Sequence, residues 1–289
     1  MRLVLAQEDG LNVAACDRLL ARLPNDQAAG QEEITIDLQA AAFIEPYGAA
    51  CLCLAAQRLA GQHRRLVIVL PSHANARATA GQIGLAAALR PWAELRNLPP
   101  GQETRDERGS TLPLSPIRSR SDVQAIVGYL VSQAQQRLGF DTGDVLDASK
   151  VVSELCYNVV DHSQAEGLAV AQILRDRQGQ RYISLAVVDA GVGIRASLAG
   201  RHPEAAQWRH GEAIQRALGE MLSDPTKVEG NLAMVIAIVR GDQGECECVH
   251  WRRHQLPAGK ALADLSRNEL LRLGMQDSCP ASTDRLLVV

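Results

Sequence analysis

Residues 153–163 combine a polar and an apolar stripe on one predicted helix. Glu154, Asn158 and Asp161 follow one another at i, i+4 and i+7, so a helix places them on one face, which we call the polar stripe. The apolar residues between them fall on another face, which the helix can bury. A carboxylate and a carboxamide are thereby aimed in the same direction. On its own, such a pattern is more often a solvated surface than a ligand site.

A second motif follows a predicted buried strand at Ile183–Val188. Asp189, Gly191 and Gly193 come directly after this apolar run, as at a strand that ends in a tight turn. Glycine lets the backbone turn without a side chain in the way and approach a ligand closely. A lone turn of this kind is common. The two motifs in this order, with a helix and then a predicted hairpin between them, point to a bound nucleotide.

The residue types suit a magnesium nucleotide. The carboxamide oxygen of Asn158 is a ligand that a hard cation such as Mg²⁺ accepts, and Glu154, one turn earlier, could orient or deprotonate a nucleophile. Asp189 could accept a hydrogen bond from an exocyclic amine of a base. The sequence contains no GxxxxGK[ST] motif, which excludes a P-loop protein.

The two motifs resemble the N box and the first glycine box of the GHKL ATPases, which include gyrase, histidine kinases and anti-sigma-factor serine kinases. The resemblance covers residues 121–289 and implies a two-layer α/β sandwich of the Bergerat type that binds ATP and Mg²⁺. It further implies that Glu154 acts as general base, Asn158 as magnesium ligand and Asp189 as adenine reader. Thr283 resembles the threonine of the family's closing Gly-Thr pair, with Ser282 in place of the glycine.

The second glycine box departs from that family. Only Gly230 stands where two glycines are expected before the apolar run Leu232–Val235. Glycines at a helix N-terminus let backbone N–H groups cradle a phosphate. We therefore expect Gly230 to contact phosphate, but the phosphate to be bound more weakly than by the two glycines of the family pattern.

Residues 1–96 alternate between strand and helix patterns, which predicts a mixed sheet with helices packed on it. The expected strands are Leu3–Leu5, Ile34–Leu38 and Leu66–Leu70, and the expected helices are Asn12–Leu23, Tyr47–Ala60 and Ala74–Leu89.

The first region resembles the STAS domain of anti-sigma-factor antagonists. The resemblance lies in the strand Ile34–Leu38 and in the turn Glu45–Gly48 that opens a helix of small residues. In that family a serine or threonine of this turn is phosphorylated, whereas this turn has neither. Pro46 at the first helical position and Gly48 keep the turn shape plausible. The alternative is a plain α/β domain.

The composition shifts to proline, glycine, serine and charged residues between the two regions. We predict a STAS-like domain at 1–96, a linker at 97–120 and a GHKL-type ATP-binding domain at 121–289. Leu112–Ile117 could still form an edge strand, because prolines exclude it only from the middle of a sheet. In the second region we expect a helix capped by Ser121 or Asp122, and closed by Gly139.

Charge and cysteine content limit the classes of partner. The net charge is −3 and no run of lysine and arginine is present, so we expect no direct contact with nucleic acid. No stretch approaches the ~18 apolar residues of a membrane span. The seven cysteines are an odd number and lie mostly in apolar segments, which favours reduced core thiols. The N-terminus has no basic region followed by a long apolar run, so we expect a cytoplasmic protein.

These expectations combine into a cytoplasmic ATP- and Mg²⁺-binding regulator of the anti-sigma-factor-kinase type. Its nucleotide state would control contact with a regulatory protein that contains a STAS domain or resembles a sigma factor, and a homodimer is a further option. If it is an enzyme, the reaction is phosphoryl transfer to a protein serine or threonine, or slow ATP hydrolysis. The alternative is a non-catalytic GHKL-fold interaction module that has lost ATP binding or turnover.

Overall fold

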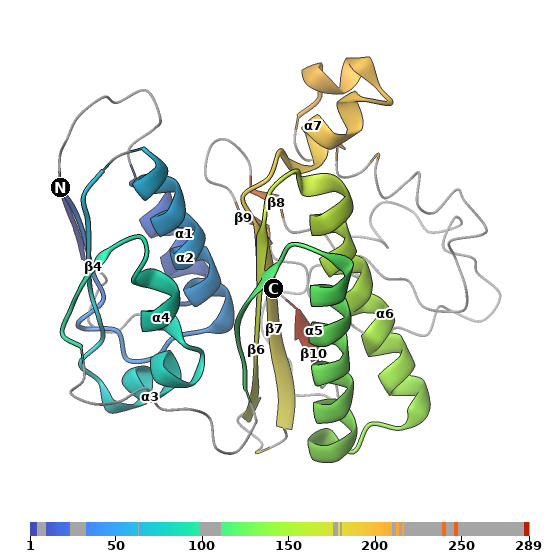
Figure 1. The fold of residues 1–289 in the computed structure, drawn as a ribbon, viewed down its shortest axis with the longest axis horizontal. Helices are drawn as coiled ribbons and strands as arrows, with labels where there is room; N and C mark the ends of the chain where they lie inside the picture. Colours follow the sequence, from blue (N-terminus) through green and yellow to red (C-terminus); the bar gives the residue numbers. More distant parts are fainter. Residues whose placement is uncertain are drawn as a thin grey trace. The chain divides into compact units, whose positions relative to one another are not determined.

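The chain contains two compact units in a computed structural model (Figure 1). The structure describes residues 1–4, 10–23, 33–62, 64–98, 111–175, 179, 181–209, 212–213, 216, 239–240, 246–247 and 286–288. The first unit comprises Met1–Ile117, Gly167–Gln172 and Leu185–Asp189, and the second comprises Arg118–Glu166, Ile173–Ser184 and Ala190–Val289. The two units do not follow the predicted division into residues 1–96 and 121–289, because two long strands, at residues 167–175 and 181–189, contribute residues to both units.

The first unit is built on a parallel sheet. Its strands, in the order β1-β2-β3-β4, are β1 (Arg2–Val4), β2 (Ile34–Asp37), β3 (Leu66–Val69) and β4 (Glu94–Arg96). Each neighbouring pair is parallel, so the predicted mixed sheet is wrong for this region. Helices between successive strands return the chain to the same end of the sheet, which makes the strands parallel. The fourth strand was not predicted.

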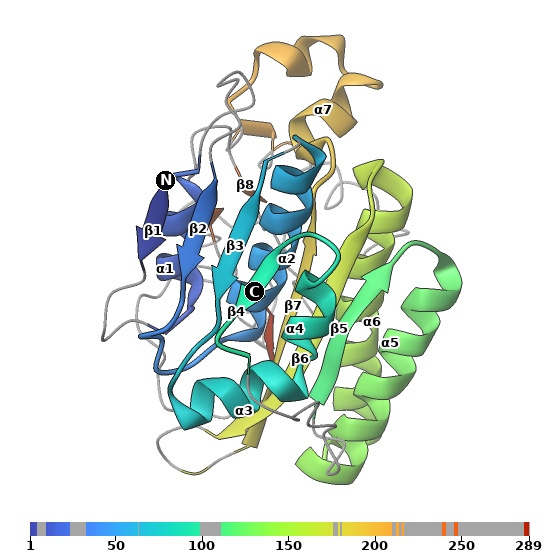
Figure 2. The same ribbon diagram turned by 60° about the vertical axis from the view of Figure 1, so that its left-hand side comes forward.

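Helices cover one face of this sheet. They are α1 (Val13–Leu20), α2 (Pro46–Gly61), α3 (Ala74–Gln82) and α4 (Leu85–Leu89). Figure 2 shows the four strands in front and α1, α2 and α4 behind them. Sequential strand order with right-handed crossovers places successive helices on the same side. Alternate strand residues such as Leu3, Ile36 and Ile68 are buried, and each such side chain contributes about 1.5–3 kcal/mol.

The predicted helix Ala74–Leu89 is broken in two. Gly84 adopts φ of 72°, a left-handed conformation that glycine tolerates and that ends α3 before α4 begins. The carbonyl of Ile83 accepts a hydrogen bond of 3.0 Å from the Leu114 N–H. The break therefore leaves the carbonyl oxygen free to bond with a segment that is distant in sequence.

A buried carboxylate ends β2. Asp37 is 4% exposed and accepts hydrogen bonds from the Arg2 guanidinium and from the Gln39 N–H, the latter at 2.9 Å. Burial raises the pKa of Asp37, but the two hydrogen bonds and the charge of Arg2 outweigh it and leave the pKa below its ordinary value. The ionised form is therefore favoured by folding.

Replacing Asp37 tests this contribution. An aspartate with a lowered folded-state pKa stabilises the protein above its unfolded pKa of about 3.9, and this stabilisation is lost as the pH falls through the folded pKa. We expect Asp37→Asn to lower the free energy of unfolding by about 1–2 kcal/mol at pH 7, and to flatten its pH dependence below about pH 4. Urea unfolding at several pH values measures both.

The matched control is Arg96→Gln. Arg96 pairs with Glu94 at 3.0 Å on the exposed surface of the same sheet, where such a pair contributes at most about 1 kcal/mol. An Asp37→Asn loss no larger than that of Arg96→Gln would contradict the role of the buried carboxylate.

The second sheet has the order β10-β7-β6-β5. Its strands are β5 (Thr111–Ile117), β6 (Gly167–Arg175), β7 (Arg181–Asp189) and β10 (Leu286–Val288). β5 lies at the sheet edge, antiparallel to β6, and its register shifts between Leu112 and Ser115. Part of the predicted linker is thus an edge strand, where Pro113 and Pro116 are tolerated. A separate pair joins β8 (Val239–Arg240) to β9 (Cys246–Glu247).

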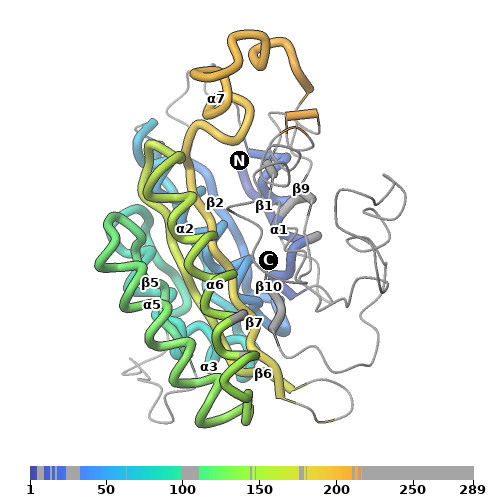
Figure 3. Tube along the Cα trace, turned by 90° about the vertical axis from the view of Figure 1, so that its right-hand side faces the viewer, coloured from blue at the N-terminus to red at the C-terminus, as the bar shows by residue number. Residues whose placement is uncertain are grey.

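Two long helices of the second unit, α5 (Arg120–Gln133) and α6 (Thr142–Asn158), run side by side (Figure 3). α5 begins with a capping box in which Ser119 is the cap and Asp122 closes the box, so the predicted cap at Ser121 or Asp122 is wrong. α5 continues into a π-helical turn and ends at Gly139, as predicted, with φ of 65°.

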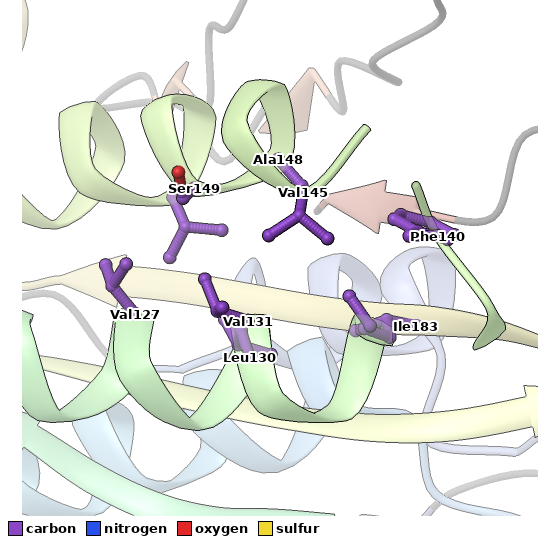
Figure 4. Close-up of a pocket in the computed structure, with 10 residues that line it drawn as sticks. Val127, Leu130, Val131, Phe140, Val145, Ala148, Ser149 and Ile183 are labelled. Carbon is purple, nitrogen blue, oxygen red and sulfur yellow. The ribbon is translucent and has the colours of Figure 1, made fainter. Parts of the chain in front are cut away.

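The contact between these helices is apolar. Valine and leucine side chains of α5 and α6 point toward each other, with Ile183 of β7 and Phe140 beside them (Figure 4). They leave a cavity of about 10 Å³, which is room for no more than about one water molecule. This interior is packed rather than open to a ligand.

The chain after β7 forms a small folded segment. It contains α7 (Gly193–Ala199) and the 3-10 helix Pro203–Gln207. Their apolar residues form a cluster of their own, with Ala205, Trp208 and Ala213 buried and Ile194, Leu198 and Ala199 partly buried. Farther along the chain, Glu212, Ala213 and Arg216 are helical. Within the described ranges, no helix has the length and apolar content needed to cross a membrane.

Candidate functional site

The polar stripe lies along the exposed side of α6 and of the π-helical turn that follows it. Glu154, Asn158 and Asp161 are exposed, whereas Cys156 and Val159 are buried. Burial raises the pKa of the Cys156 thiol to about 12, so this thiol is held neutral inside the unit. One side of the helix thus exposes side-chain oxygen atoms, and the other side is buried in the unit.

A π-helical turn, Val159–Ser163, follows α6 and changes the direction of Asp161. A π turn holds more residues than an α turn, so each residue advances by a smaller angle. Asp161 is therefore rotated about the helix axis away from the position, in line with Glu154 and Asn158, that it would have in an uninterrupted α-helix. π turns inside helices are frequent at functional sites.

Asp161 is paired with Arg120 of α5. The Nη2 atom of Arg120 donates to both carboxylate oxygens at 3.1 Å. The same guanidinium lies 4.9 Å from the ring centroid of Tyr157, which precedes Asp161 by one turn. Arg120 is separated from Asp161 by 41 residues. No local pattern in the sequence predicts this pair.

The glycine turn packs against the end of the polar-stripe helix. The Val192 N–H donates a hydrogen bond of 2.9 Å to the Ser163 carbonyl. A Cβ atom on Gly191 would lie only 2.1 Å from the same carbonyl oxygen, so this close approach requires glycine. The Ser163 hydroxyl donates to the Ala165 carbonyl at 2.6 Å and accepts from the Ala165 N–H at 3.0 Å, which fixes the turn. The structure thus brings the two motifs into direct contact.

Gly193 and Asp189 stand on either side of this contact. Gly193 has φ of 74°, which glycine adopts without strain, and it is the first residue of α7. Asp189 is exposed and is the last residue of β7. The strand, the turn and the helix start therefore follow one another as the sequence pattern predicts.

Two predicted site residues, Gly230 and Thr283, lie outside the described residues. Among the described residues, the candidate site consists of Glu154, Asn158, Asp161 and the glycine turn with Asp189. Exposed carboxylate and carboxamide oxygens fit a hard cation. The described part of the chain has no group of three histidine, cysteine or acidic side chains arranged for a metal. Mg²⁺ often takes only one or two protein carboxylates and keeps several waters, so its binding does not require such a group.

The turn Glu45–Gly48 opens α2 in the first unit, and Pro46 occupies the start of the helix as predicted. The Glu45 carboxylate does not cap its own helix but accepts from the Val13 N–H at the start of α1. Burial raises the pKa of Glu45 above its ordinary value, although this hydrogen bond lowers it. A Cβ atom on Gly48 would lie 2.2 Å from the Leu11 carbonyl oxygen. The turn is therefore held by the residues that lead into α1.

Gly191→Ala tests the contact between the motifs. Because the added methyl group would overlap a backbone carbonyl, the turn must move, and we expect a loss of at least about 2 kcal/mol in the free energy of unfolding. Urea unfolding followed by circular dichroism measures it.

Gly200→Ala is the matched control at the end of α7. Gly200 has φ of −65° and its Cβ position is open space, so alanine should be neutral or stabilising by up to about 1 kcal/mol. Equal effects of the two substitutions would show that the Gly191 contact is not tight.

Comparisons of the chain with protein-family models, curated proteins and solved structures find no match. The case for a function therefore rests on the residues and contacts described above.

Proposed function

We propose that the second region binds ATP with Mg²⁺ through the polar stripe and the glycine turn, and that the bound nucleotide regulates contact with a protein partner. The observation that carries this proposal is the contact of Gly191 and Val192 with Ser163. Two motifs that are each common as surface features meet at one place, and both present polar atoms there.

Each residue has a distinct role in this proposal. Asn158 ligates Mg²⁺ through its carboxamide oxygen, and Glu154 orients or deprotonates the nucleophile. Asp189 reads the adenine amine, and Gly191 and Gly193 give close backbone approach. Gly230 and Thr283 complete the phosphate side by resemblance to the GHKL pattern. The first region, which resembles a STAS domain, offers the surface for a STAS-containing or sigma-factor-like partner.

One observation favours the second candidate, a non-catalytic interaction module with the same fold. The Arg120 guanidinium already engages both carboxylate oxygens of Asp161. The incomplete glycine box at Gly230 points in the same direction. In that case the second region would contact its partner whether or not nucleotide is present.

Calorimetric titration with ATP and Mg²⁺ tests nucleotide binding. We expect measurable binding by the wild type and at least about tenfold weaker binding by Asp189→Asn, which corresponds to about 1.4 kcal/mol for one lost charged hydrogen bond. Asn158→Ala should remove the dependence on Mg²⁺. Glu204→Gln, at an exposed carboxylate on the 3-10 helix, is the control and should bind as the wild type does. No heat with the wild type, or equal affinity of Asp189→Asn, would refute the proposal.

Turnover of γ-labelled ATP separates an enzyme from a sensor. If Glu154 is the base, Glu154→Ala should lower phosphate release by about 10²-fold or more while ATP binding persists. Release that is the same in both proteins would exclude Glu154 as the base. Binding without any release by the wild type would identify a nucleotide sensor.

A further inference from the structure

The hydroxyl of Ser163 is bonded to the backbone at the end of the π-helical turn. Ser163 is 6% exposed and is the last residue of this turn. Its hydroxyl donates to the Ala165 carbonyl at 2.6 Å and accepts from the Ala165 N–H at 3.0 Å. Both bonds pass over Gln164, the residue in between. A buried hydroxyl that makes both of its bonds to nearby backbone acts on the course of the chain.

Gln164 has a backbone conformation that glutamine rarely adopts. Its φ of 59° and ψ of 17° lie in the left-handed region, which costs free energy for a residue with a Cβ atom. Asn97 is the other non-glycine residue with positive φ in the described part of the chain. Its own carboxamide donates to the Leu70 carbonyl at 2.8 Å. Gln164 is exposed, and the bonds that bridge it are those of the Ser163 hydroxyl.

The bend at Gln164 determines where the Ser163 carbonyl points. This carbonyl accepts the hydrogen bond of 2.9 Å from the Val192 N–H. A Cβ atom on Gly191 would lie 2.1 Å from the Ser163 carbonyl oxygen and 2.6 Å from the Ser163 Cβ atom. Asn158 ends α6, and the π-helical turn joins it directly to Ser163. A rotation of the backbone at Ser163 would therefore move the glycine turn relative to Asn158.

We propose that Ser163 is a positioning residue: its hydroxyl holds Gln164 in the left-handed conformation and so keeps the glycine turn aligned with Glu154 and Asn158. This inference rests on the proposed nucleotide site and adds to it a residue that does not touch the ligand. A ligand that spans both motifs depends on this alignment. A ligand that contacts the glycine turn and Asp189 alone does not.

The test compares these two kinds of ligand on variants of the full chain. Calorimetric titrations of the wild type, Ser163→Ala, Gln164→Gly and the double variant use ATP with Mg²⁺, and adenosine. We expect Ser163→Ala to weaken ATP binding about tenfold, as for one lost hydrogen bond, and to change adenosine binding less than about twofold. Gln164→Gly should bind both ligands as the wild type does. The double variant should recover ATP binding to within about threefold of the wild type, because glycine adopts the left-handed conformation without help.

Ser149→Ala is the matched control on α6. The Ser149 hydroxyl also donates to nearby backbone, at 2.8 Å to the Leu146 carbonyl, and this variant should bind both ligands as the wild type does. Urea unfolding provides a readout that needs no nucleotide. Ser163→Ala should lower the unfolding midpoint, and the added Gln164→Gly substitution should raise it again.

Each other result overturns a defined statement. If the double variant binds ATP as weakly as Ser163→Ala, the hydroxyl does not act through Gln164 and the inference fails. Equal weakening of ATP and adenosine by Ser163→Ala would mean a general loss of structure and would also overturn it. If Ser163→Ala binds ATP as the wild type does, or the wild type binds ATP but no adenosine, the inference fails while the proposed nucleotide site stands. If the wild type binds neither ligand, the proposed function fails and the inference fails with it.

Discussion

The carbonyl oxygen of Ser163 is the atom on which the candidate site depends. It ends the helix that carries Glu154 and Asn158, and it accepts the hydrogen bond of the turn that follows β7. Only a glycine at position 191 lets the two backbones come this close. The glycine turn and the helix that carries Glu154 and Asn158 come from separate parts of the sequence, and backbone atoms hold them together.

One side of α6 is packed inside its unit, and the other side carries residues of the candidate site. Buried residues such as Cys156 and Val159 hold the helix in the unit, where the small apolar cavity beside α5 leaves no space for a ligand. The exposed side has no comparable packing and is organised by charge, through the pair of Arg120 and Asp161. A ligand site on α6 is therefore a surface site, and its affinity is more sensitive to ionic strength than that of an enclosed pocket.

The sequence predicts features with a local cause and misses those with a distant one. Pro46 at the start of α2 and Gly139 after α5 were predicted because proline and glycine act on their own backbone. The exposed positions of the polar stripe follow from helical periodicity alone. The parallel strand direction, the break at Gly84 and the Arg120 pair depend on partners tens of residues away, such as the Leu114 N–H for the Ile83 carbonyl. The residue types of Val159–Ser163 do not distinguish a π turn from a continued α-helix.

The cluster around Trp208 gives this protein an internal optical probe. Trp208 is 6% exposed, and the guanidinium of Arg216 lies 4.2 Å from its ring. The segment that holds it begins at Gly193, directly after the turn that contacts Ser163. A rearrangement of this segment would change the polarity and the charge next to the indole, whereas Trp92 in the other unit is 38% exposed and already near water. The sequence has three tryptophans, so a variant that keeps Trp208 alone would report the state of α7 through its emission wavelength, without an added label.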